Sequence, residues 1–356
     1  TNTAYRMYSK DSWTYYNGQW MTVYGLMHNQ NRDMKWEIKK EFDVGLDFSL
    51  FNRRLNGRMD YFSRKIEDAI YSGIPVASPP AVYATSTVNI GDITNKGFEF
   101  ELNGRVVDTK DWTFDTSLVG SFVGKSRLEG MAKDTHMEFQ AMPHGGGSAV
   151  RIFGGQEIGR YFLYRFAGVR EEDGTPMIYS KDNKVIPYAS GTDEDRVQTG
   201  NGLPKAVLSW NNTVRYRNWD LNLFFRSWLG QDVYNVTDMI QGVNCKITEG
   251  QNLLRTAYRR NKAITNTDRL MLLDYWLEKG DFLKLDAVTL GYTLPRNKIK
   301  YVEKLRCYFT VRNVCTLTGY SGLDPEVNVN GLAPGFEGMS QYPRTRSFIL
   351  GIEIGF

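Results

Sequence analysis

The sequence predicts an all-β protein, a transmembrane antiparallel β-barrel to which these residues contribute about nine strands. Three observations support this fold class. Apolar and polar side chains alternate with a period of two along most of the chain. The alternating runs are 12–17 residues long, whereas sandwich strands average about 5–6 residues and membrane-spanning strands need about 9–11. Finally, short and long connections alternate, as they do in membrane barrels.

The strand-like runs are numerous, and each has one apolar and one polar face. In NKGFEFELNG, for example, Phe98, Phe100 and Leu102 alternate with Glu99 and Glu101. The predicted strands cover about 36–50, 55–71, 93–107, 112–126, 205–217, 219–235, 281–294, 304–318 and 345–356. In the seventh run the apolar phase changes near residues 286–287, which predicts a β-bulge.

The connections indicate which end of the barrel faces outward. Short connections occur at 51–54, 108–111, 218 and 295–303, and long ones at 72–92, 127–204, 236–279 and 319–344. Short turns lie on the periplasmic side of a membrane barrel and long loops lie outside. Counted from the end of the chain, the last strand runs from the long-loop side to the short-turn side. The C-terminus is therefore expected in the periplasm. Aromatic residues gather near the short turns, as in an interfacial girdle: Trp112, Tyr216, Trp219, Tyr292 and Phe356.

The number of strands indicates an incomplete barrel. Single-chain bacterial barrels have an even number of strands, and an open sheet edge cannot face lipid. Residues 13–27 are a candidate tenth strand, but they alternate poorly. The chain is therefore expected to be the C-terminal part of a larger barrel.

Composition excludes several other classes of protein. The net charge of +4 comes without a Lys/Arg cluster, which argues against a nucleic-acid partner. No apolar stretch reaches the ~18–20 residues of a transmembrane helix. Cys307 and Cys315 would lie too far apart on one strand to form a disulfide. A soluble sandwich, which would share the alternation, remains the alternative fold.

No catalytic or metal-binding constellation is apparent, so neither an enzyme nor a cofactor is expected. His28, His136 and His144 lack metal-ligand spacing. The GGGS of 145–148 lacks the lysine of a phosphate loop. The DEDR of 193–196 could offer oxygens to Ca²⁺, although a solvated acidic loop is the simpler interpretation.

The polar face of the strands is expected to line the barrel lumen. It carries Asp43, Asp47, Arg58, Glu99, Glu101, Arg105, Asp115, Arg215, Asp220, Arg226, Arg306 and Arg312. These residues could contact other protein in the lumen or simply hydrate it. Their mixed charge argues against an ion-selective ring. Trp228 is expected on the same polar face, near the long-loop end of its strand. There its ring could stack on a ligand or pack under a loop.

The sequence resembles the C-terminal barrel portion of SusC/RagA-like TonB-dependent outer-membrane transporters. The most specific matches are FLKLDAVTLGYTLP (282–295), RNVCTLTGYSGLDPEV (312–327) and the terminal aromatic residue. Further matching stretches occur in family order at 35–62, 89–103, 203–235 and 342–356. Together they cover nearly the whole chain.

The resemblance implies a 22-stranded barrel in the outer membrane of a Bacteroidota-type bacterium. It also implies a plug domain and a TonB-contacting segment, neither found in residues 1–356, and a SusD-like surface lipoprotein as a partner. The expected function is TonB-driven uptake of oligosaccharides or peptides. A structural or adhesive barrel without active transport is the alternative.

Two groups of residues are singled out by the family motifs. Tyr234 lies in GQDVYN, and Tyr320 and Asp324 lie in GYSGLDPE. With Trp228 they are candidate ligand contacts, although shaping the loops or packing beneath them is the simpler role. The last strand resembles the signal read by the outer-membrane assembly machinery, through Phe348, Leu350, Ile352, Ile354 and Phe356.

Overall fold

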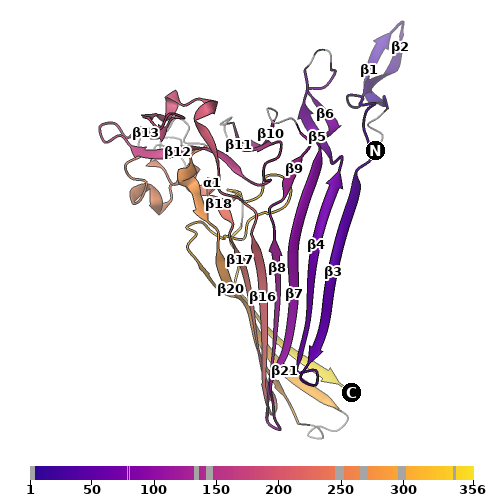
Figure 1. Ribbon diagram of the computed structural model, residues 1–356, viewed down its shortest axis with the longest axis vertical. Coiled ribbons are helices and arrows are strands. Elements are labelled where there is room, and N and C mark those ends of the chain that lie inside the picture. Colours follow the sequence, from indigo (N-terminus) through magenta and orange to yellow (C-terminus); the bar gives the residue numbers. More distant parts are fainter. Residues whose placement is uncertain are drawn as a thin grey trace.

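The computed structural model consists of one tall sheet with a layer of folded loops at one end (Figure 1). It describes residues 5–77, 79, 81–131, 136–141, 147–244, 252–264, 272–295, 302–339 and 342–356. In this part of the chain, no helix is long and apolar enough to cross a membrane.

The nine predicted strands are present and form a single antiparallel sheet. The sheet runs in the order β22-β21-β20-β17-β16-β8-β7-β4-β3. In chain order the strands are β3 (Ile38–Leu50), β4 (Leu55–Glu67), β7 (Asp92–Asp108), β8 (Trp112–Val123), β16 (Ala206–Tyr216), β17 (Trp219–Leu229), β20 (Phe282–Thr293), β21 (Lys304–Thr318) and β22 (Ser347–Gly355). The short β9 (Arg127–Glu129) pairs with the long-loop end of β7.

Residues 13–27 do not add a full strand to this sheet. They belong to a separate hairpin of β1 (Tyr8–Tyr16) and β2 (Gln19–Leu26), which pair only with each other. The hairpin projects beyond the long-loop end of the sheet (Figure 1). Among the described strands, β3 and β22 therefore form the two edges of the sheet.

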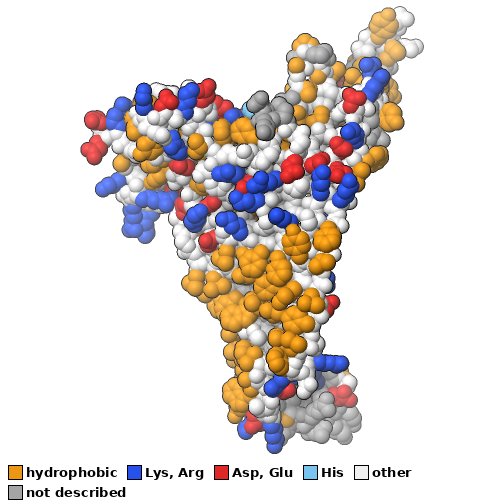
Figure 2. Space-filling view, viewed as in Figure 1, with side chains coloured by type: hydrophobic (Ala, Val, Ile, Leu, Met, Phe, Trp, Pro, Cys, Tyr) orange, Lys and Arg blue, Asp and Glu red, His pale blue; other side chains and the backbone are white. Residues whose placement is uncertain are grey.

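The strand register gives the sheet one apolar face and one polar face. Across the sheet, Phe98 aligns with Phe122 and Tyr61, and in the next row Phe100 aligns with Met59. Figure 2 shows the result as a broad apolar band below a more charged region. Such a band is expected of a wall that faces lipid.

Four of the five residues of the predicted aromatic girdle form a row at the short-turn end. Trp112, Tyr216, Trp219 and Tyr292 are successive partners on four neighbouring strands. The rings of Trp112 and Tyr216 lie 4.3 Å apart, and those of Trp219 and Tyr292 lie 4.8 Å apart. Trp112 and Trp219 remain about half exposed, which suits an interfacial position.

The predicted bulge is also present. Leu285 pairs with Phe225, whereas Ala287 pairs with the preceding Phe224, so Asp286 is the extra residue. The extra residue lets both halves of β20 keep their apolar side chains on one face. If Asp286 took a regular place in the ladder, the leucines before it and the apolar residues after it would lie on opposite faces.

The long connections fold into a common layer at the end opposite the short turns (Figure 1). One connection forms the hairpin of β5 (Ile70–Pro75) and β6 (Thr85–Asn89). The longest forms a six-stranded sheet of β10 (His136–Ala141), β11 (Ser148–Phe153), β12 (Tyr161–Val169), β13 (Pro176–Tyr179), β14 (Val185–Pro187) and β15 (Arg196–Thr199). The third contributes β18 (Asp232–Tyr234), α1 (Val236–Gln241) and β19 (Leu277–Lys279).

The buried core of the chain lies in this loop layer. Tyr161, Tyr234 and Trp276, which come from two different connections, are fully buried and belong to one cluster. Phe336, from the last connection, packs against both tyrosine rings, 5.3 Å from that of Tyr161 and 5.6 Å from that of Tyr234. The long loops are therefore a packed unit rather than independent flexible segments.

Gly335 allows the last connection to enter this core. Its φ of +84° lies in the left-handed region, and a Cβ there would come within 2.1 Å of the Tyr161 hydroxyl and 2.6 Å of the Gly202 Cα. The Tyr161 hydroxyl lies 2.9 Å from the carbonyl oxygens of both Asp232 and Gly335 and donates to one of them.

We expect Gly335→Ala to destabilise the loop layer by about 3 kcal/mol, through steric overlap and backbone strain. The measurement is amide hydrogen exchange at Tyr234, whose N–H donates to the Gly335 carbonyl oxygen. Gly331→Ala is the matched control, because Gly331 has φ +77° but no atom within 4 Å of a Cβ. It should cost only the strain, about 1 kcal/mol. Equal effects of the two substitutions would contradict the packing argument.

Candidate functional site

The residues predicted to line the lumen share the polar face of the sheet. Asp47, Arg58 and Glu101 are successive partners on β3, β4 and β7, and Arg215 pairs with Asp220 between β16 and β17. The remaining members follow the same phase: Asp43, Glu99, Arg105, Asp115, Arg226, Arg306 and Arg312. The structure thus brings all twelve onto one surface, whereas a role in the lumen remains a prediction.

Ion pairs neutralise much of this polar face. The Arg105 Nε lies 2.8 Å from Asp115, and the Arg215 Nη1 lies 3.1 Å from the same carboxylate. The Arg306 Nη2 lies 2.6 Å from the Asp220 Oδ2 across β20. That contact passes over Gly291, where a Cβ would come within 2.6 Å of both side chains. The surface offers alternating charges rather than a ring of one sign.

A buried ion network joins the last connection to the polar face near its long-loop end. Lys284 is only 2% exposed, and its Nζ lies 2.9 Å from both the Asp324 Oδ1 and the Glu326 Oε2. Arg226 on β17 lies 3.1 Å from Glu326, and Arg344 lies 3.1 Å from Asp324 and 3.0 Å from Glu326. Three cationic side chains are thus paired with the carboxylates of Asp324 and Glu326, because a buried charge is stable only beside an opposite one.

Two local features hold this network in place: the DPE turn and the bulge in β20. Asp324 also accepts from the backbone N–H of Glu326, so the DPE turn holds both carboxylates toward the wall. The Gln231 side chain donates to the Pro325 carbonyl oxygen at 3.1 Å. The bulged Asp286 accepts from the Arg226 Nε at 2.7 Å. Of this network, the sequence placed Arg226 on the polar face and singled out Asp324, but it did not indicate Lys284 or Glu326 as their partners.

The four candidate ligand contacts have different environments. Trp228 is half-buried on the polar face, with its ring 5.6 Å from that of Phe282, and remains a candidate. Asp324 is engaged by Lys284 and Arg344.

Direct ligand contact does not fit Tyr234 or Tyr320. Tyr234 is fully buried, and Tyr320 is 6% exposed. The Tyr234 hydroxyl accepts from the Leu272 N–H at 3.1 Å. Burial in the apolar core raises the pKa of Tyr234 far above its usual value, so the hydroxyl stays neutral. Their burial favours the alternative interpretation that both tyrosines shape the loops, which stays a prediction.

The other sequence features form no metal site in the described residues. In the DEDR segment, Asp195 accepts from the N–H groups of Thr192 and Lys181, and these hydrogen bonds lower the pKa of Asp195. Asp193 pairs with Arg151 and Arg196. The acidic oxygens are thus used within the loop. His144 and Cys245 lie outside the described residues.

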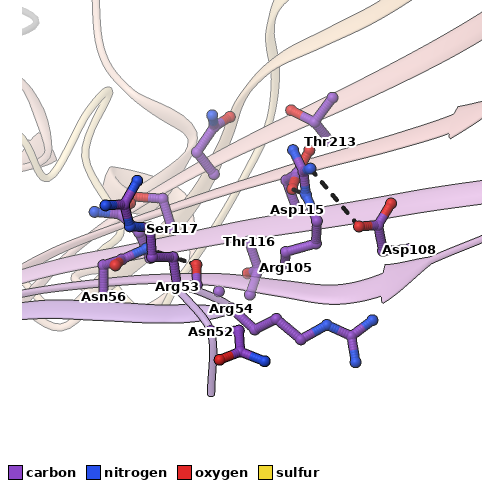
Figure 3. A pocket seen from close by; sticks show the side chains of 13 residues that line it. Asn52, Arg53, Arg54, Asn56, Arg105, Asp108, Asp115, Thr116, Ser117 and Thr213 are labelled. Atoms are coloured by element: carbon purple, nitrogen blue, oxygen red, sulfur yellow. Dashed lines mark hydrogen bonds and ion pairs between the residues drawn. The ribbon is translucent and has the colours of Figure 1, made fainter. Parts of the chain in front are cut away.

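A hollow of about 440 Å³ opens on the polar side of the sheet at its short-turn end (Figure 3). The β3–β4 turn supplies Asn52, Arg53 and Arg54 on one side. Strands β4, β7, β8 and β16 supply the rest of its lining: Asn56, Asn103, Gly104, Arg105, Asp108, Asp115, Thr116, Ser117, Asn211 and Thr213. The hollow has no local sequence signal, because its shape depends on the path of the turn.

The two-faced wall, its aromatic row and its one-sided loop layer define a segment of a transmembrane β-barrel. The comparison with known families identifies which kind. Residues 2–314 match the family described as TonB dependent receptor-like, beta-barrel, and the chain belongs to this family.

Individual relatives agree with this assignment. The chain is 27% identical to TonB-dependent receptor P3 of Formosa agariphila and 26% identical to TonB-dependent receptor SusC of Bacteroides thetaiotaomicron, in each case over 92% of the chain. It spans 35% and 32% of those proteins, about a third of their length. The structure of the RagAB peptide transporter shares the fold, with a TM-score of 0.79 at 18% identity, over 99% of this chain and 39% of that one.

The buried network predicts a strong effect of a single carboxylate. We expect Glu326→Gln to loosen the last connection from the wall by about 2 kcal/mol, because Lys284 and two arginines lose a shared anion. Limited proteolysis within residues 319–339 measures this. Glu194→Gln is the matched control, since Glu194 makes an exposed ion pair with Lys181 and should change cleavage little. Equal cleavage of the two variants would show that the network does not hold the loop.

The same contact predicts a dependence on pH. Burial opposes ionisation of Glu326, but hydrogen bonds from Arg226 and Lys284 outweigh it and lower the pKa of Glu326 below its usual 4.5. A lowered carboxylate pKa contributes stability that is complete above the unfolded pKa and is lost as the pH falls through the folded pKa. Protection of residues 319–339 from hydrogen exchange should therefore be constant above pH 4.5 and fall below it. In Glu326→Gln this fall should be weaker; an unchanged profile would exclude Glu326 as its source.

Proposed function

We propose that the chain is part of the barrel of an outer-membrane importer that takes up oligosaccharides or peptides by a TonB-dependent mechanism. Membership of the TonB-dependent receptor family is the observation that carries this proposal. The relatives include a receptor named SusC, and the RagAB fold neighbour is described as a peptide transporter. The proposed substrate class keeps both oligosaccharides and peptides, as the sequence resemblance implied.

The wall would serve import by separating lipid from a polar path. Its apolar face would contact the membrane, and its ion-paired polar face would line the lumen, where other parts of the protein, including a plug, could lie. No covalent chemistry is required of these residues. Selective binding at the mouth, followed by energy from TonB, would constitute the mechanism.

The orientation and partners follow from the same arrangement. With the long-loop layer outside the cell, the C-terminus would be periplasmic. A SusD-like lipoprotein would cover the loop layer from above. Phe348, Leu350, Ile352 and Ile354 lie on the apolar side of the edge strand β22, and Phe356 follows the strand directly. All five are at least half exposed, in keeping with a role in barrel assembly.

The transport hypothesis is tested by deleting the gene for the whole receptor and measuring growth on a panel of oligosaccharides and peptides. Import predicts loss of growth on at least one of them, restored by the wild-type gene only when TonB is present. Normal growth on every member, with loss of surface adhesion, would favour the structural or adhesive alternative.

Trp228 provides a test within the chain. If its ring contacts the cargo, Trp228→Ala in the full-length receptor should weaken binding of the imported compound about tenfold, the order expected for loss of one aromatic contact. Isothermal titration of the purified receptor measures this. Trp210→Ala is the matched control, because Trp210 lies on the apolar face and is 45% exposed there. Equal affinities of the two variants would assign Trp228 to loop packing.

A further inference from the structure

The apolar band on the outer face of the wall ends before the strands reach the loop layer. Tyr61, Phe98 and Phe122 are aligned on β4, β7 and β8 and form the last apolar row on these strands. On β8 this row lies ten residues from Trp112, which belongs to the aromatic row at the short-turn end. At roughly 3.3 Å per residue and a strand tilt of about 40°, that distance corresponds to a height of about 25 Å, as in membrane barrels. The last apolar row therefore marks the second surface of the membrane.

Basic side chains follow directly beyond this row. The next two rows contain four cations, which form the cationic belt: Lys40 on β3, Lys65 on β4, Lys96 on β7 and Arg127 on β9. Lys96 lies two residues beyond Phe98. In the row after it, Lys40 pairs with Lys65, Lys65 pairs with Thr94, and Thr94 pairs with Arg127. Like charges directly opposite each other destabilise a sheet unless an anion lies nearby.

The cationic belt faces away from the loop layer. Ile66 pairs with Ile93, and Ile93 pairs with Leu128, in the row that alternates with the belt. Leu128 belongs to the buried loop core, and the two isoleucines pack against it. Because successive side chains of a strand point to opposite faces, the belt lies on the lipid-facing side of the wall. Each of its side chains is exposed or half-buried, and Figure 2 shows Lys and Arg gathered on the wall just above the apolar band.

Acidic side chains lie one row further from the apolar band. On β4, Glu67 lies two residues beyond Lys65. On β7, Asp92 lies two residues beyond Thr94 and pairs with Glu129 on β9. Along these strands the outer face is thus first apolar, then cationic and then acidic.

The acidic row neutralises only part of the cationic belt. The Lys40 Nζ lies 2.7 Å from Glu67, and the Lys65 Nζ lies 2.8 Å from Asp92. Lys96 and Arg127 form no ion pair with any residue that the structure describes. They are diagonal neighbours on β7 and β9, a position in which Cα atoms lie about 7–8 Å apart. An anion bound by one is therefore within reach of the long side chain of the other.

This order of charges fits a layer of lipid headgroups. Phosphate groups lie directly outside the acyl chains, where they attract Lys and Arg side chains. A guanidinium binds two phosphate oxygens at once, and a lysine can lay its stem along apolar surface while its amine contacts the headgroup. Carboxylates next to the acyl chains would repel the phosphates, and here they lie one row further away. A soluble anion would give the cations no reason to follow the edge of the apolar band.

We propose that the cationic belt binds the phosphate groups of lipopolysaccharide in the outer leaflet, chiefly through Lys96 and Arg127. The acyl chains of the bound lipid would lie against Phe98 and Phe122. The proposal rests on the orientation given under the proposed function, with the loop layer outside the cell, because lipopolysaccharide occupies the outer leaflet alone. It assigns the outer face of the wall a specific lipid in addition to general contact with the membrane.

The test measures lipid binding to the purified full-length receptor in detergent by native mass spectrometry. The probes are lipopolysaccharide, the same lipid dephosphorylated with hydrofluoric acid, and phosphatidylglycerol. We expect the wild-type receptor to prefer phosphorylated lipopolysaccharide. Combining Lys96→Gln with Arg127→Gln should weaken that binding about thirtyfold, since each cation near an anionic lipid surface contributes about fivefold.

Two further variants control for total charge and for folding. Lys181→Gln with Lys184→Gln removes the same charge from the turn between β13 and β14 in the loop layer, and it should bind like the wild type. Lys96→Arg with Arg127→Lys keeps both charges at the belt and should also retain binding. Heat-modifiable migration on gels verifies that each variant has a folded barrel.

Three outcomes would overturn the proposal. They are equal affinities of the belt variant with two glutamines and the loop-layer control, equal binding of the phosphorylated and dephosphorylated lipids, and a preference for phosphatidylglycerol. Because the assay involves no transport, a failed growth test with lipid binding retained would refute the import function and leave the lipid site intact. Loss of the lipid preference with normal import would do the reverse.

Discussion

The register between neighbouring strands is the constraint on which the rest of the structure depends. A slip of one residue in any ladder would move apolar side chains onto the polar face and charged ones into lipid. The cost would be large, because the bilayer offers no water to either the backbone or the charges. Correct register aligns Asp47, Arg58 and Glu101, and it also produces the row of four aromatic rings. One geometric condition thus creates both surfaces.

The loop layer obeys a different rule. Its core is held by apolar packing around Tyr161, Tyr234 and Trp276, as in a soluble domain. It meets the wall through charged groups, with Lys284 enclosed by Asp324 and Glu326. A buried lysine in this position is stable only while its anions are present, so the attachment of the last connection is directional and specific rather than simply hydrophobic.

The wall could be predicted from the sequence because lipid imposes a period-two pattern that neighbouring loops lack. All nine strands and the bulge at Asp286 were readable in this way, as was the shared phase of the charged residues. The loop layer was not. Tyr234 and Tyr320 lie in segments without periodicity, so nothing in the sequence distinguishes an exposed tyrosine from one buried by residues distant in the chain.

The same limit explains the features that were missed. Lys284 has a readable phase, but its partner Glu326 lies about 40 residues away on an irregular segment, at a separation that no local pattern encodes. The turn at Phe51, Asn52 and Arg53 contains no glycine, the usual signal of a left-handed conformation. The turn is held by its internal hydrogen bond from the Arg54 N–H to the Phe51 carbonyl oxygen, and by one from the Arg105 N–H on β7 to the Arg54 carbonyl oxygen, which is a tertiary contact.

The bulge in β20 also bears on how such a wall can change length. Elsewhere in a strand, inserting or deleting one residue exchanges the two faces beyond that point. At Asp286 the extra residue is looped out of the ladder, so the alternation is preserved with or without it. Asp286 is therefore a position where the strand tolerates a one-residue difference in length. Since its carboxylate binds Arg226, the inserted residue has become part of the attachment between wall and loops.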